Sequence, residues 1–85
     1  MKLIEGGEIL MDIDYFDGKT LREVYVILER LGMKEKIPAE MMDYLTEKQD
    51  LTHQFDFNEH APLIDQLENE NTKILLAYLV DKYIK

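Results

Sequence analysis

The chain has 85 residues, of which 18 are Asp or Glu and 10 are Lys or Arg, so its formal net charge at pH 7 is −8. Hydrophobic residues make up 46% and charged residues 33%, a balance typical of a folded domain and not of a disordered acidic tail. This length predicts one domain, and the absence of cysteine excludes disulfides, a thiolate nucleophile and cysteine-bound zinc. No segment reaches the roughly 18 apolar residues of a membrane span, and the first residues lack the features of a secretory signal. We therefore expect a cytoplasmic protein that does not bind membranes.

The negative charge is concentrated in the middle of the chain. Residues 38–72 contain nine acidic residues against Lys48 alone, whereas the segments on either side are nearly balanced. This region either forms a solvated face that keeps the protein soluble or forms a docking face for a protein partner with a basic surface. Its charge also argues against direct binding of nucleic acid. The candidate partner-binding residues are Glu40, Asp43, Glu47, Asp50, Glu59, Asp65, Glu68 and Glu70.

The first residues have the pattern of a β-hairpin. Leu3–Glu5 and Glu8–Leu10 flank Gly6–Gly7, a pair suited to a two-residue turn, and residues 11–15 continue with alternating apolar and polar positions.

A second explanation for this segment comes from the genetic code. Codons for Glu5–Glu8 can contain a purine-rich ribosome-binding sequence, and Met11 follows at about the distance of a bacterial start codon. Residues 1–10 would then be a leader that precedes the natural start. Both explanations remain open, so the predicted domain is residues 1–85 or begins at Met11.

The clearest helix is predicted over residues 20–31. Thr20 and Glu23 have the spacing of a capping box, and Gly32 supplies the left-handed residue that ends a helix. Apolar residues recur every three or four positions at Leu21, Val24, Ile27, Leu28 and Leu31.

Two further helices are predicted over residues 38–48 and 71–84. Pro38 is favoured at the first position of a helix, and Asn69 or Asn71 can cap the last one. The last helix is apolar on every side from Ile74 onward, so we expect it to be the central helix of the core.

Residues 51–57 alternate in polarity, with Leu51, His53, Phe55 and Phe57 on one side, which predicts a strand that pairs with residues 11–15. The predicted fold class is therefore α+β, with three helices packed on a small antiparallel β-sheet or hairpin in a single compact domain.

The order of features from residue 20 onward resembles a group of small uncharacterised proteins from Gram-positive bacteria, chiefly clostridial and often encoded near mobile elements. The resemblance lies in an amphipathic first helix followed by short motifs in the same order: Ile37-Pro38-x-x-Met41, Phe55-x-Phe57, Pro62-Leu63-x-Asp65-Gln66, Glu70-x-Thr72-Lys73 and Leu75-Leu76-x-Tyr78-Leu79. It covers about three quarters of the chain and implies a shared fold, with no activity and no catalytic residue to transfer.

No catalytic or metal site is predicted. Asp12, Asp14 and Glu23 have the spacing of a calcium loop, but Phe16 stands where that loop needs a side-chain oxygen. His53 and His60 match neither a helical nor a zinc-finger spacing, and His53 is interpreted as a structural, hydrogen-bonded histidine. We expect no cofactor and no enzymatic activity.

The sequence therefore predicts a small acidic interaction module, monomeric or weakly dimeric, that presents the acidic surface of residues 40–70 to a protein. The alternative is an inhibitor encoded by a phage or mobile element whose carboxylates imitate DNA phosphates. Such a protein would occupy the basic channel of a host nuclease or defence complex, in the manner of an anti-CRISPR protein.

Overall fold

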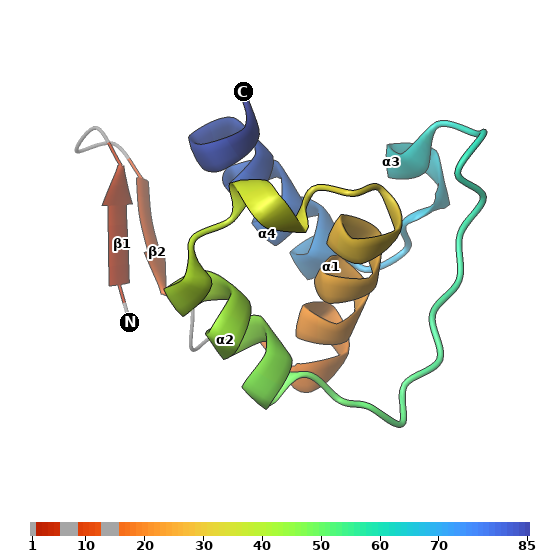
Figure 1. The fold of residues 1–85 in the computed structure, drawn as a ribbon, viewed down its shortest axis with the longest axis horizontal. Coiled ribbons are helices and arrows are strands. Elements are labelled where there is room, and N and C mark those ends of the chain that lie inside the picture. Colours follow the sequence, from red (N-terminus) through yellow and green to blue (C-terminus); the bar gives the residue numbers. More distant parts are fainter. Residues whose placement is uncertain (1, 6–8, 13–15) are drawn as a thin grey trace.

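Three helices pack side by side and form the body of the protein (Figure 1). The computed structural model describes residues 2–5, 9–12 and 16–85. Helix α1 contacts both α2 and α4. The elements, in chain order, are β1 (Lys2–Glu5), β2 (Ile9–Asp12), α1 (Gly18–Arg30), the 3₁₀ turn η2 (Lys34–Lys36), α2 (Ala39–Lys48), α3 (Leu63–Gln66), α4 (Glu70–Leu79) and the π-helical turn η3 (Val80–Ile84).

The core lies where the apolar faces of these helices meet. Its fully buried side chains are Leu21, Val24, Ile27, Leu28, Leu45, Leu75 and Leu79, with Thr20 and Thr72 among them. The central helix is α1 and not, as expected, the last helix, because α1 is covered by α2 on one side and α4 on another. On α4, Ile74 remains 49% exposed and Ala77 is also exposed. The run of apolar residues in α4 therefore buries only one of its faces.

The predicted α+β class is wrong, because the fold is helical. Among the described residues, the main helix contacts are between helices, and the two strands pair with each other and with no third strand. This hairpin lies at one side of the helical body (Figure 1). Its register runs from Lys2 opposite Asp12 to Glu5 opposite Ile9, which is one residue away from the pairing of Glu5 with Glu8 that the predicted two-residue turn requires. Residues 6–8 contain the predicted turn, and residues 13–15 belong to the predicted strand that continues from residue 11. Both segments lie outside the described residues.

Residues 51–57 do not form the predicted strand. The segment has no secondary structure beyond a turn at its start, and its predicted partner is instead paired, as far as Asp12, with β1. The predicted alternation is visible in the burial from His53 onward: His53 and Phe55 are half-buried and Phe57 is buried, whereas the intervening side chains are exposed. It fails at Leu51, which is 71% exposed. The apolar side of the segment packs against the core through side chains, without a hydrogen-bonded neighbouring strand in the described part of the chain.

The first helix begins and ends through local hydrogen bonds. Its N-cap is Asp17, whose Oδ1 accepts from the Thr20 N–H at 2.9 Å, so the predicted capping box of Thr20 and Glu23 is wrong. At the other end Gly32 has the expected positive φ of 72°. The N–H groups of Gly32 and Met33 donate to the carbonyls of Glu29 and Leu28, which is the Schellman arrangement.

The burial on α4 predicts that alanine substitutions at two adjacent residues lower the free energy of unfolding by different amounts. Leu75→Ala removes a fully buried side chain and should lower the free energy of unfolding by about 2–5 kcal/mol. Ile74→Ala, on the half-exposed side, should change it by no more than about 1 kcal/mol. Urea unfolding followed by circular dichroism measures both, and equal losses would contradict the placement of α4.

The cap of α1 predicts a pH dependence. Hydrogen bonds from Thr20 lower the pKa of Asp17 below its usual 3.8, so the charged form stabilises the folded state. The contribution is complete above the unfolded pKa and is lost as the pH falls through the lower folded pKa. Asp17→Ala should therefore cost about 1 kcal/mol at pH 7, and the difference from the wild type should shrink below about pH 4 in unfolding curves. A difference that is constant down to pH 2 would argue against this cap.

Candidate functional site

Three of the eight candidate acidic residues form a row on the outer side of α2. Glu40, Asp43 and Glu47 are three and four positions apart, which places them on one side of a helix, and all three are exposed. The opposite side of α2 contributes Met41 and Leu45 to the core. None of the three carboxylates has a hydrogen bond or ion pair within the part of the chain that the structure describes. We call these three residues the α2 acidic row.

The other five candidate residues lie after α2. Glu59 pairs with Arg30 at 3.2 Å, Glu70 pairs with Lys73 at 3.3 Å, and Asp50 accepts from the backbone and hydroxyl of Thr52. Two others, Asp65 on α3 and Glu68 before α4, are exposed and have no such partner among the described residues. Because α2 and α3 lie at opposite sides of the molecule (Figure 1), the structure separates the α2 acidic row from these two residues.

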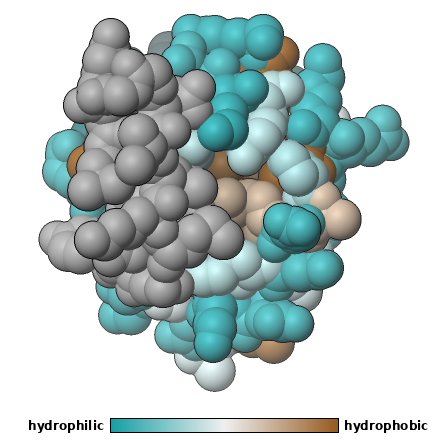
Figure 2. Space-filling model, turned by 90° about the vertical axis from the view of Figure 1, so that its left-hand side faces the viewer, coloured by the Kyte–Doolittle hydropathy of each residue, from teal (hydrophilic) through white to brown (hydrophobic). Residues whose placement is uncertain are grey.

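The surface on the side of the hairpin is mostly hydrophilic where it is described. Figure 2 shows hydrophilic side chains around a small apolar area in the middle of that face.

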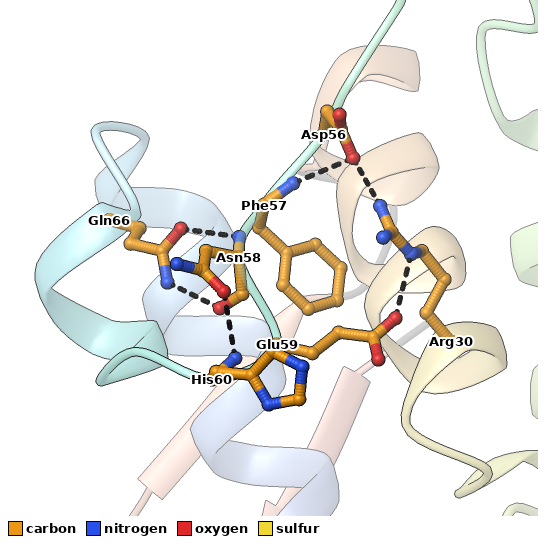
Figure 3. Close-up of polar contacts among 7 residues, drawn as sticks. All are labelled: Arg30, Asp56, Phe57, Asn58, Glu59, His60 and Gln66. Carbon is orange, nitrogen blue, oxygen red and sulfur yellow. Dashed lines mark hydrogen bonds and ion pairs between the residues drawn. The ribbon is translucent and has the colours of Figure 1, made fainter.

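A single arginine fixes the loop that follows residue 55. Arg30, in the last turn of α1, donates to the carboxylates of Asp56 and Glu59, and its guanidinium lies 4.8 Å from the centre of the Phe57 ring (Figure 3). The hydrogen bond from Arg30, together with that from the Phe57 N–H, holds the pKa of Asp56 below its usual value. The ring of Phe57 is thereby held between the core and an ion-paired cation.

An amide clamp closes the same loop on α3. Gln66 accepts from the Asn58 N–H at 2.7 Å and donates to the Asn58 carbonyl at 2.8 Å (Figure 3). The Asn58 side chain accepts in turn from the N–H of His60 at 2.9 Å. His60 itself is exposed, and its ring has no hydrogen-bond partner among the described residues.

A buried carboxylate joins the extended segment to two helices. Glu23, on α1, is 9% exposed; one oxygen accepts from the Thr72 hydroxyl of α4 at 2.8 Å, and the other lies 2.8 Å from Nε2 of His53. Asn69 caps α4 by accepting from the Asn71 N–H, and it also donates to the hydroxyl of Thr20. The prediction that His53 is a hydrogen-bonded structural histidine is confirmed.

Glu23, His53 and Asn69 also line an open groove between the extended segment and the connection from α3 to α4. The groove has a volume of about 530 Å³, within the range of small-ligand clefts. It is lined by Glu23, His53, Gln54, Phe55, Asp56, Gln66, Glu68 and Asn69.

In and beside the groove, the polar atoms of Glu23 and Thr72 are engaged by other side chains or buried. Both oxygens of Glu23 are occupied, and Thr72 is fully buried, so neither is presented to a substrate. Within residues 16–85 and the described strands, no three His, Asp or Glu residues come together as they would around a metal ion. Of the calcium pattern, Asp14 and the side chain of Asp12 lie outside the described residues, and Glu23 is turned toward His53 and Thr72.

The sequence did not reveal the Glu23 network. Its partners lie 30 and 49 residues away along the chain, beyond any local motif. The one available signal was His53 on the apolar side of the alternating segment, which indicated a buried partner without identifying it.

The comparisons with known proteins add no relative to this picture: no family model, curated protein or solved structure matches the chain significantly. Within the described residues, no helix is both long enough and apolar enough to cross a membrane.

The Glu23 network predicts a difference between two glutamates of the same helix. Glu23→Gln keeps the shape of the side chain but loses the charge that two groups contact, and it should lower the free energy of unfolding by about 1.5–3 kcal/mol. The matched change Glu29→Gln affects an exposed carboxylate that pairs only with Lys34, and it should cost at most about 1 kcal/mol. Thermal and urea unfolding of both variants measure the difference. A cost for Glu23→Gln no larger than that for Glu29→Gln would show that the network does not hold the fold together.

Proposed function

We propose that this chain is a non-enzymatic interaction module that presents the α2 acidic row to a basic surface of a protein partner. The observation that supports the proposal is the state of the three carboxylates: Glu40, Asp43 and Glu47 share one exposed side of a helix and have no internal cation partner in the described structure. Carboxylates on a protein surface attract cationic partners over about one Debye length, roughly 8 Å at physiological ionic strength.

The position of the row also suits recognition. The helix is anchored by its other side, where Met41 and Leu45 are buried, so the charged side can change without loss of core contacts. Charge complementarity of this kind raises the rate of association and selects partners more than it adds affinity. The proposal includes a cytoplasmic, monomeric or weakly dimeric protein without a cofactor, and membership of the Gram-positive group that the sequence resembles.

A second candidate function uses the same row. Over the seven positions from Glu40 to Glu47 the helix rises about 10 Å, so three negative charges lie along a strip that a channel for a polyanion would attract. On this alternative the partner is a nuclease or defence complex, and the row occupies its basic channel in place of DNA phosphates.

Charge reversal of the row tests the proposal. The triple variant Glu40→Lys, Asp43→Lys and Glu47→Lys should fold, because all three residues are exposed, and it should lose partners that the wild-type protein captures from an extract of the source cell. Quantitative mass spectrometry of the captured proteins, followed by calorimetry with each purified candidate, measures the effect.

A matched variant controls for total charge. Glu29→Lys, Glu35→Lys and Asp81→Lys change the net charge by the same amount at exposed positions outside α2, and this variant should keep the partner. Equal capture by the two variants would refute the α2 acidic row as a docking face. Competition by duplex DNA and a steep loss of affinity with salt would favour the DNA-imitating inhibitor over a general interaction module.

A further inference from the structure

The charged side chains that line the groove beside Phe55 are mostly carboxylates. The described lining contains the carboxylates of Glu23, Asp56 and Glu68 and no lysine or arginine. Its other residues are His53, Phe55 and the side-chain amides of Gln54, Gln66 and Asn69. Glu23 is engaged by His53, and Asp56 by Arg30, so Glu68 is the lining carboxylate whose charge is not matched by another described residue. The unmatched Glu68 carboxylate therefore favours a cationic occupant that donates hydrogen bonds.

The groove also contains an aromatic ring. Phe55 is half-buried and lines the groove, with its ring centre 5.8 Å from that of Phe57. Aromatic rings attract guanidinium and ammonium groups that lie over them, and arginine is the more frequent partner.

A neighbouring part of the protein shows what such a combination binds. There the Arg30 guanidinium lies over the Phe57 ring while Asp56 and Glu59 accept its hydrogen bonds (Figure 3). Phe55 lies two residues before Phe57 in the extended segment and lines the groove together with Glu68, which precedes α4. The groove thus has a ring and a carboxylate in its lining, and it contains no arginine or lysine of the described chain. The groove therefore repeats the ring and the carboxylate of the Arg30 site.

We infer that this groove receives an arginine side chain of the protein partner, at a site separate from the α2 acidic row. The inference rests on the proposed function, because that function supplies the basic partner. Arginine fits better than lysine because its planar group can lie on the Phe55 ring and donate to the Glu68 carboxylate together.

Amide NMR of the full-length, nitrogen-15-labelled chain tests the inference, with N-acetylarginine amide as the probe and N-acetyllysine amide as the comparison. Arginine should shift the amide signals of residues 53–56 and 66–69, with a dissociation constant about threefold or more below that of lysine. Glu68→Gln should raise the arginine dissociation constant by about threefold or more. Its matched control is Asp65→Asn, which also neutralises an exposed, unpaired carboxylate but lies outside the groove lining, and this variant should bind as the wild type does.

Three results would overturn the inference: no shifts in the groove, equal binding of the arginine and lysine probes, or equal effects of Glu68→Gln and Asp65→Asn. The α2 charge-reversal variant distinguishes a failure of the proposed docking face from a failure of the groove inference, because it leaves the groove unchanged. Loss of partner capture by that variant together with an unresponsive groove would remove only this inference. Retained capture together with arginine binding in the groove would remove only the proposed docking face.

Discussion

The rest of this small helical protein depends on the contacts that the Glu23 carboxylate makes with His53 and Thr72. Glu23 lies 9% exposed inside α1, and it is contacted by the hydroxyl of Thr72 on α4 and by the ring of His53 on the extended segment. Burying a carboxylate costs free energy unless its oxygens accept hydrogen bonds. The buried Glu23 is therefore stable only when α1, α4 and the extended segment are in contact. With 85 residues and no disulfide, the protein relies on such side-chain contacts to fix the start of the segment, while Arg30 holds the part that follows Phe55.

The same contact shapes the surface that a ligand would meet. Because His53 is held against α1, residues 53–56 run past the connection between α3 and α4 and leave a groove between the two. Further along, Arg30 and the amide clamp of Gln66 hold the loop at both sides. The α2 acidic row does not depend on this network, since the other side of its helix buries Met41 and Leu45 in the core. The protein thus has two acidic surfaces with different origins, one set by helix periodicity and one by a tertiary polar network.

Sequence patterns located the elements whose causes are local. The predicted helices at 20–31, 38–48 and 71–84 differ by at most two residues at either end from α1, α2 and the combined α4 and η3, and Gly32 ends α1 as expected. The patterns failed where contacts with residues distant in the sequence determine the local structure. Residues 51–57 alternate as a strand does, but alternation predicts only which side chains are buried, and pairing requires a neighbour that β1 already occupies up to Asp12. The spacing of Thr20 and Glu23 fitted a capping box, yet contacts with residues far along the chain took both side chains into the interior.

A double-mutant cycle between Glu23 and His53 measures whether this pair ties the extended segment to α1. The free energy of unfolding is measured for Glu23→Gln, for His53→Gln and for the combined variant. If the pair ties the extended segment to α1, the coupling energy should be about 1 kcal/mol or more, because each single change removes the same contact. Additive effects, with a coupling below about 0.3 kcal/mol, would contradict the account and leave the groove without its structural basis.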